Sequence, residues 1–163
     1  PLGAEINPKF VKYNLIDHGF LLNLLGIGDS TNSIVKELLV DNAADLVDKG
    51  SLTEMVAGLE LLKYMSPNER HDLYYWQNLT RGTVSEVDYV LSRGIDIVPM
   101  EVKSGLRGSM ASLYVFMEKE HIKYAIRCSL ENFGEFVSPK GKKILVNPLY
   151  AISNLFSCGE RLL

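Results

Sequence analysis

The sequence predicts one mixed α/β domain: a helix, three antiparallel strands, a second helix and a further strand. Apolar residues recur at helical spacing over residues 51–65, alternate over residues 73–103, and repeat this change after residue 109. A chain of 163 residues that is 47% hydrophobic is large enough to bury one sizeable core. We therefore expect a mixed sheet flanked by helices over residues 50–163, with a helical extension over residues 1–49 packed on it.

The extension is expected to hold short helices. Asp17 is a suitable N-cap for a helix that ends at Gly26, after a strand or turn over residues 12–15. Residues 30–47 carry an apolar stripe typical of one or two helices.

The first core helix is predicted over residues 51–65 and ends before Pro67, which cannot continue it. Glu54 and Glu60 flank its apolar face on opposite sides. That face is formed by residues three or four positions apart: Leu52, Met55, Val56, Leu59 and Leu62.

The remaining elements follow from changes in apolar period. The pattern predicts a short aromatic strand, a hairpin, a helix, a strand, and finally an edge strand with a proline break and a closing helical turn. In order, these are residues 73–76, 86–91 with 97–103, 109–121, 123–129 and 142–156.

The predicted hairpin brings polar side chains together. A turn at Gly94 places Asp88 opposite Glu101 and Glu86 opposite Lys103. With a period of two, these four side chains share one face. The other face is expected to be core, with Val87, Tyr89, Leu91, Val98, Met100 and Val102.

The Cβ atoms of Asp88 and Glu101 would then lie about 5 Å apart, and the two carboxylates would repel each other unless a cation lies between them. Hard oxygen ligands select Mg²⁺ or Mn²⁺. Lys103, two residues after Glu101, would stabilise negative charge developing on phosphorus. This arrangement indicates a phosphodiester hydrolase.

A simpler interpretation stays open, because any half-exposed hairpin shows the same alternation. Glu86 would then only pair with Lys103 on the surface. The loop that contains Ser104 and Arg107 opens a helix, and it is equally typical of a phosphate contact and of a flexible connection. The basic run Lys140, Lys142 and Lys143 is typical of a solvated turn.

Composition sets limits on function. The 20 acidic and 17 basic residues differ from the balance of a dedicated nucleic-acid binder, so any nucleic-acid contact must be local. No apolar stretch is long enough to cross a membrane, and a cytoplasmic location is expected. The spacing of Cys128 and Cys158 favours reduced thiols over a zinc site.

In combination, four stretches resemble the PD-(D/E)xK nuclease superfamily, and more narrowly a C-terminal domain of uncharacterised function in prokaryotic AAA-type P-loop ATPases. They are KFVKYNLIDHGFLLNLLG at 9–26, GSLTEMVAGLELLKY at 50–64, LYYWQN with SEVDYVLSRG within 73–94, and VPMEVKSG at 98–105.

The resemblance implies a restriction-endonuclease-like core. Asp88 matches the central aspartate of that superfamily, Glu101 and Lys103 match its (D/E)xK motif, and Glu54 matches the glutamate of the first core helix. Glu60 falls on a second recurring acidic position, and Val87 stands where proline is usual.

Two hypotheses about function follow. One is a Mg²⁺- or Mn²⁺-dependent nuclease domain acting on DNA more readily than on RNA, with Asp88, Glu101 and Glu54 as metal ligands. The other is a catalytically silent module that binds nucleic acid or a protein partner. In either case the resemblance implies an attached N-terminal ATPase domain, which the silent module would regulate. We expect this fragment to bind no nucleotide itself. An oligomer is compatible with either hypothesis.

Overall fold

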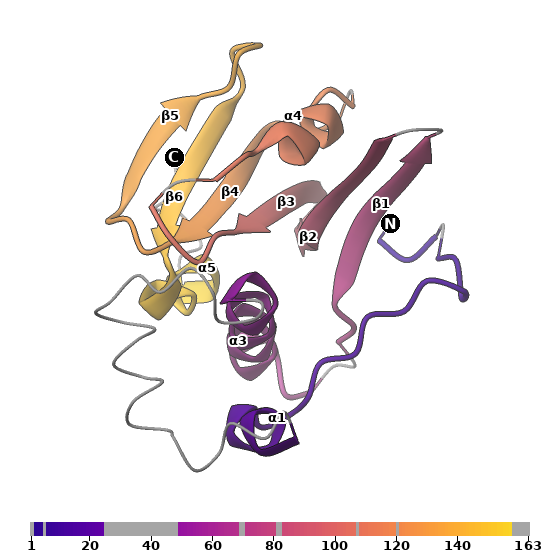
Figure 1. The fold of residues 1–163 in the computed structure, drawn as a ribbon. Helices are drawn as coiled ribbons and strands as arrows, with labels where there is room; N and C mark the ends of the chain where they lie inside the picture. Colours follow the sequence, from indigo (N-terminus) through magenta and orange to yellow (C-terminus); the bar gives the residue numbers. More distant parts are fainter. Residues whose placement is uncertain are drawn as a thin grey trace.

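A six-stranded mixed sheet with helices on both faces forms the centre of the molecule (Figure 1). The structure, a computed structural model, describes residues 2–4, 6–24, 49–68, 71–80, 83–106, 108–119 and 121–157. The helices are α1 (His18–Leu24), α3 (Lys49–Tyr64), α4 (Ala111–Met117), the 3₁₀ turn η2 (Leu149–Ala151) and α5 (Asn154–Ser157). The strands are β1 (Tyr74–Thr80), β2 (Thr83–Arg93), β3 (Asp96–Val102), β4 (Tyr124–Ser129), β5 (Gly134–Val137) and β6 (Lys143–Pro148).

The strands lie in the order β1-β2-β3-β4-β6-β5. The first three are antiparallel, β4 is parallel to both β3 and β6, and β5 closes the sheet antiparallel to β6. α4 is the helix of the crossover between parallel β3 and β4, as such a connection requires. The predicted order of helix, three strands, helix and strand is therefore confirmed.

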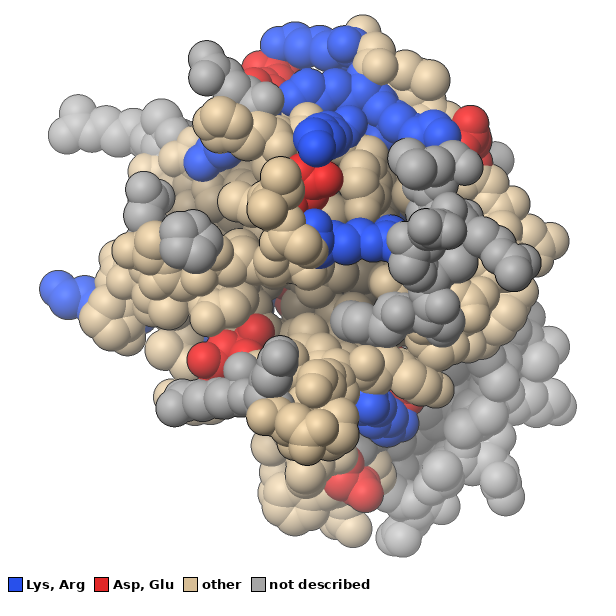
Figure 2. Space-filling model, turned by 180° about the vertical axis from the view of Figure 1, so that it is seen from behind, with Lys and Arg blue, Asp and Glu red and all other residues tan. Residues whose placement is uncertain are grey.

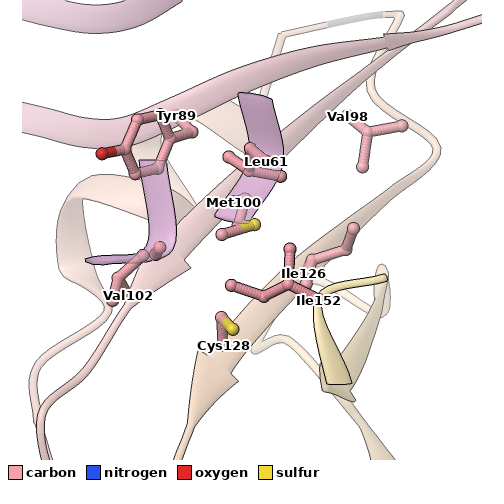
Figure 3. Packing of buried hydrophobic residues seen from close by; sticks show 9 residues of the cluster. Leu61, Tyr89, Val98, Met100, Val102, Ile126, Cys128 and Ile152 are labelled. Atoms are coloured by element: carbon pink, nitrogen blue, oxygen red, sulfur yellow. The ribbon is translucent and has the colours of Figure 1, made fainter. Parts of the chain in front are cut away.

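α3 and the C-terminal turns cover one face of the sheet. Ala57 and Leu61 of α3 pack with Met100 and Val102 of β3 and with Ile152. Figure 3 shows how the side chains of this cluster meet between helix and sheet. Its buried members are Ala57, Leu61, Tyr89, Val98, Met100, Val102, Ile126, Cys128 and Ile152. Burial on this face holds α3 across β2 and β3.

α4 covers the other face. Leu113, Phe116 and Met117 of α4 pack on Val87 and Val90 of β2. Trp76 adds an edge-to-face contact with Phe116, with ring centroids 5.0 Å apart. Trp76 is thus packed against the core, the arrangement usual for an aromatic residue on a strand beside a core.

The buried face of α3 differs from the predicted stripe. Leu61 is fully buried, whereas Leu62 is 38% exposed, so the prediction for Leu62 was wrong. The helix is thus turned about its axis relative to the prediction. Gly58 allows this orientation, because a Cβ there would come within 2.4 Å of the Tyr89 hydroxyl oxygen. Gly58 therefore faces Tyr89 of β2 at a point where a side chain would not fit.

The C-terminal part of the sheet also differs from the prediction. β6 lies between β4 and β5, so the prediction of an edge strand was wrong. The edge strand on this side of the sheet is β5, whose four residues are mostly exposed and show no alternating apolar pattern. α4 spans residues 111–117 and is shorter than predicted.

The N-terminal segment runs beside β1 (Figure 1). The Asp17 carboxylate accepts a hydrogen bond of 2.8 Å from the backbone N–H of Phe20, which confirms the predicted N-cap of α1. Residues 12–15 form neither strand nor hydrogen-bonded turn, and the helices predicted over 30–47 lie outside the described residues. Within the described ranges, no helix has both the length and the apolar character needed to span a membrane.

Candidate metal centre

The hairpin has the predicted register from Tyr89 to Arg93, but the predicted pairs Asp88 with Glu101 and Glu86 with Lys103 are not part of the ladder. Tyr89 pairs with Met100, and the ladder continues in step to Arg93 opposite Asp96 at the turn. Beyond Tyr89 the carboxylate of Asp88 takes part in the pairing, because its Oδ2 accepts a hydrogen bond of 2.7 Å from the backbone N–H of Val102. One oxygen of Asp88 is thus fixed to β3.

A β-bulge lies at Asp88. Tyr74 pairs with Val90 and Trp76 pairs with Val87, so Asp88 and Tyr89 together face the single residue between them on β1. The bulge breaks the alternation of β2: Val87 packs beneath α4, whereas Tyr89 packs beneath α3. The prediction that Val87 shares a face with Tyr89 was therefore wrong.

Glu54 is brought to the hairpin by the packing of α3. The Tyr89 hydroxyl donates a 2.7 Å hydrogen bond to the backbone carbonyl of Glu54, directly fixing the helix on the strand. As a result, carboxylate oxygens of Glu54, Glu86 and Asp88 all lie within 4.8 Å of one another. We call these three residues the acidic cluster. Such a set of hard oxygen donors suits Mg²⁺ or Mn²⁺.

Lys12 is the cation of the acidic cluster. Its Nζ lies 2.6 Å from Glu54 Oε1 and also forms an ion pair with Glu86. The ammonium lies 4.9 Å from the centroid of the Tyr75 ring. Glu86 therefore pairs with Lys12, and the simple surface pairing of Glu86 with Lys103 is not formed.

Glu101 and Lys103 form a second pair beside the acidic cluster. Lys103 Nζ lies 2.6 Å from Glu101 Oε1. Glu101 alternates with Met100 and Val102, which pack towards α3, so it leaves β3 on the opposite face. The prediction that Glu101 shares one face with Glu86 was wrong, although the two charges remain close enough to influence each other.

The other oxygen of Glu101 is of special interest. Glu101 is only 5% exposed, and its Oε2 has no hydrogen-bond partner among the described residues. A buried carboxylate oxygen without a donor is costly, because it has lost its hydration. The oxygen is therefore available to a cation, which makes the residues present fit a metal.

Charge repulsion and burial perturb these carboxyl groups. Burial raises the pKa of Asp88 from 3.8 to about 6, the Glu101 charge adds to the rise, and the Val102 N–H opposes it. Burial also raises the pKa of Glu101, against the hydrogen bond from Lys103. The same cause raises the pKa of Glu54, against Lys12. The protein holds these acids together at a cost in stability.

The loop after β3 is held by Arg127 of the neighbouring strand β4. The Arg127 guanidinium donates a hydrogen bond of 2.9 Å to the Leu106 carbonyl and pairs with Glu131 at 2.6 Å. Lys103 lies against Gly108, where a Cβ would come within 2.7 Å of its Cδ. Gly108 thus leaves space that the carbon chain of Lys103 occupies.

Not every predicted residue joins the site. Glu60 pairs with Lys63 on the same helix, away from the acidic cluster. Ser104 is exposed, and Arg107 lies outside the described residues. Lys12 was not predicted, because it lies in an irregular segment 42 residues from Glu54 and no motif marks it.

A cavity of about 870 Å³ opens beside the acidic cluster. The N-terminal segment forms one wall with Phe10 and Val11, and β1 forms another with Tyr74 and Trp76. Glu54, Asp88 and Lys12 also line this cavity. A ligand seated in it would therefore meet both the aromatic strand and the carboxylates.

Comparison with known proteins gives a family and no function. No curated protein and no solved structure matches the chain. Residues 49–152 match a family model and include Glu54, Glu86, Asp88, Glu101 and Lys103, whereas Lys12 precedes the matched region. That model covers more than half of the chain, which therefore belongs to the family described as Domain of unknown function (DUF4143), a domain common in proteins associated with AAA ATPases.

Proposed function

We propose that this domain is a divalent-metal-dependent nuclease that hydrolyses phosphodiester bonds, with DNA as the favoured substrate. The observation that carries the proposal is the buried Glu101 Oε2, which has no partner among the described residues and lies close to Asp88. The order α3-β1-β2-β3-α4-β4 supports a restriction-endonuclease-like core, because that core has the same sequence of elements.

The roles follow from the contacts. Asp88, Glu101 and Glu54 would hold Mg²⁺ or Mn²⁺, and the ion, when bound, would polarise a phosphate oxygen and acidify a bound water. Asp88 is suited to this role, since the Val102 N–H orients its carboxylate and leaves the second oxygen for a ligand. Lys103 would stabilise negative charge on the phosphate.

Lys103 is now paired with Glu101, so its ammonium must turn from carboxylate to substrate. The carbon chain of Lys103 lies against Gly108, and this contact would keep the stem in place while the ammonium moves. Substitution of Gly108 by a larger residue would remove that freedom.

Positive charge for a nucleic-acid backbone is present on part of the surface. Figure 2 shows Lys and Arg side chains gathered towards the upper end of the face drawn there. The basic run lies at an exposed turn, as predicted, and there Lys140 pairs with Glu118 and Lys143 pairs with Glu135 on the surface. Substrate contact must therefore depend on few charges, which suits a nuclease guided by its attached ATPase domain or by a second copy.

Cleavage assays test the proposal. Labelled single-stranded, double-stranded and branched DNA and RNA would be incubated with Mn²⁺ or Mg²⁺, comparing wild type with Asp88→Asn and Lys103→Ala. Asp96→Asn and Lys123→Ala are matched controls, because these two residues form an ion pair at a different place. Cleavage lost in the first two variants and kept in the controls supports the proposal. Equal cleavage by all five proteins would refute it.

A catalytically silent module that regulates the ATPase is the second candidate. It is favoured by the ion pairs of Lys12 and Lys103, which already compensate part of the acidic charge without any metal. Absence of cleavage by folded wild-type protein, together with ATP hydrolysis by the parent protein that changes on substitution of Asp88, would favour this candidate.

A further inference from the structure

The ammonium of Lys12 lies where a metal ion would neutralise the acidic cluster. It contacts Glu54 and Glu86, and a carboxylate oxygen of Asp88 belongs to the same cluster. A divalent ion bound by these oxygens would lie within a few ångströms of the ammonium. Two cations at such a distance repel each other strongly where water is partly excluded.

Lys12 is held firmly in place by these charges. Its Nζ contacts the carboxylates of both Glu54 and Glu86 and lies 4.9 Å from the centroid of the Tyr75 ring. A metal ion bound by the same carboxylates therefore requires the ammonium to move away.

The segment that carries Lys12 is otherwise weakly attached. Residues 6–17 form no helix or strand. Val11 and Tyr13, on either side of Lys12, are 59% and 89% exposed. Asn14 hydrogen-bonds the Tyr89 hydroxyl, and Lys12 lies over the Tyr75 ring. Movement of the segment would break these contacts together with the ion pairs of Lys12, without unfolding a helix or strand.

An independent observation indicates that the proposed ligands can accept a cation besides the resident ammonium groups. The buried Oε2 of Glu101 has no partner in the described part of the chain, although Lys103 pairs with the other oxygen of the same carboxylate. The resident ammonium groups therefore leave one acceptor of the site unsatisfied.

We propose that residues 6–14 are an inhibitory strap, in which the Lys12 ammonium competes with a divalent cation for Glu54 and for the charge of Asp88, two of the three ligands proposed above. This inference rests on the proposed metal-binding function and names its regulation. Metal binding requires Lys12 to withdraw. Because the strap also walls the 870 Å³ cavity, its withdrawal would widen the access of substrate to the same carboxylates.

The first test measures Mn²⁺ affinity by electron paramagnetic resonance of the free ion. Lys12→Met keeps the length of the side chain and removes its charge, and Lys9→Met is the control in the same exposed segment. Because the closed strap reduces the fraction of protein that can bind metal, we expect Lys12→Met to bind Mn²⁺ about tenfold more tightly or better. Lys9→Met should match wild type.

The second test uses wild-type protein and is independent of how the variant folds. Brief acetylation followed by peptide mass spectrometry measures how accessible each lysine is. Without metal, Lys12 should react more slowly than Lys9. Saturating Mn²⁺ should accelerate the labelling of Lys12 about fivefold or more and leave Lys9 unchanged, since withdrawal of a competing group exposes it.

The outcomes separate the two ideas. Equal Mn²⁺ affinity in wild type and Lys12→Met, with labelling of Lys12 unaffected by metal, would overturn the strap and leave the metal site intact. Failure of both folded proteins to bind Mn²⁺ would overturn the strap and the proposed nuclease together. Tighter binding by Lys12→Met with metal-dependent labelling of wild type supports the strap.

Discussion

Replacement of Asp88 by asparagine should stabilise the metal-free protein while removing its function. Asparagine keeps an oxygen that can accept the hydrogen bond from the Val102 N–H and loses only the charge. Burial and the Glu101 charge raise the pKa of Asp88 from 3.8 to about 6, so the ionised carboxylate is less stable in the folded than in the unfolded chain.

The magnitude follows from linkage. A rise of about two pKa units corresponds to about 3 kcal/mol when Asp88 is fully ionised. The pKa is raised on folding, so its stabilising contribution is complete below pH 3.8 and is lost as pH rises through about 6. Asp88→Asn should therefore match wild type near pH 4 and exceed it by about 2–3 kcal/mol near pH 8.

Urea denaturation in the presence of EDTA, at several pH values between these limits, measures this difference. Asp96→Asn serves as the control, because Asp96 lies in an exposed ion pair with Lys123. If the advantage of Asp88→Asn did not grow with pH, or if the variant were less stable than wild type at pH 8, the reasoning about burial and repulsion would be wrong.

Three further predictions concern the packing that holds the site. Leu61→Ala, at a fully buried position, should lower the free energy of unfolding by about 2–5 kcal/mol in urea denaturation, whereas Leu62→Ala should change it by less than about 1 kcal/mol. Gly58→Ala should cost about 1–3 kcal/mol and weaken Mn²⁺ binding, because its Cβ would push Tyr89 and α3 apart. Cys128 is fully buried and its pKa is raised by burial to about 12, so mass spectrometry should show it unmodified by iodoacetamide until the chain is unfolded.

The sequence was sufficient for the order of the elements from α3 to β4 and for the hairpin register from Tyr89 to Arg93. Both depend on local signals: the change of apolar period, Pro67 after the helix, and the turn at Gly94, which has a positive φ of 60°. These signals place Glu86 and Asp88 in one neighbourhood. Glu54 joins them because its helix, α3, packs on the same part of the sheet.

Features that depend on contacts distant in sequence could not be predicted. The bulge at Asp88 leaves no mark in the sequence. Val87 and Tyr89 are both suited to a core, and the apolar pattern does not show that they pack on opposite faces of the sheet. The burial of Leu61 in place of Leu62 depends on how closely Gly58 meets Tyr89. Lys12 reaches the site through an irregular segment, for which no periodicity exists.

The bulge makes the length of β2, as well as its composition, a condition for the site. Deleting one of the two bulged residues would restore simple alternation and leave Val87 and Val90 on their present face, but the site would lose either the Asp88 carboxylate or the Tyr89 hydroxyl that binds the backbone of Glu54. Exposed positions of the same strand, such as Val84, have no such constraint on side-chain identity. Related chains should therefore vary freely in residue type along the exposed positions of β2 but hardly ever gain or lose a residue within it.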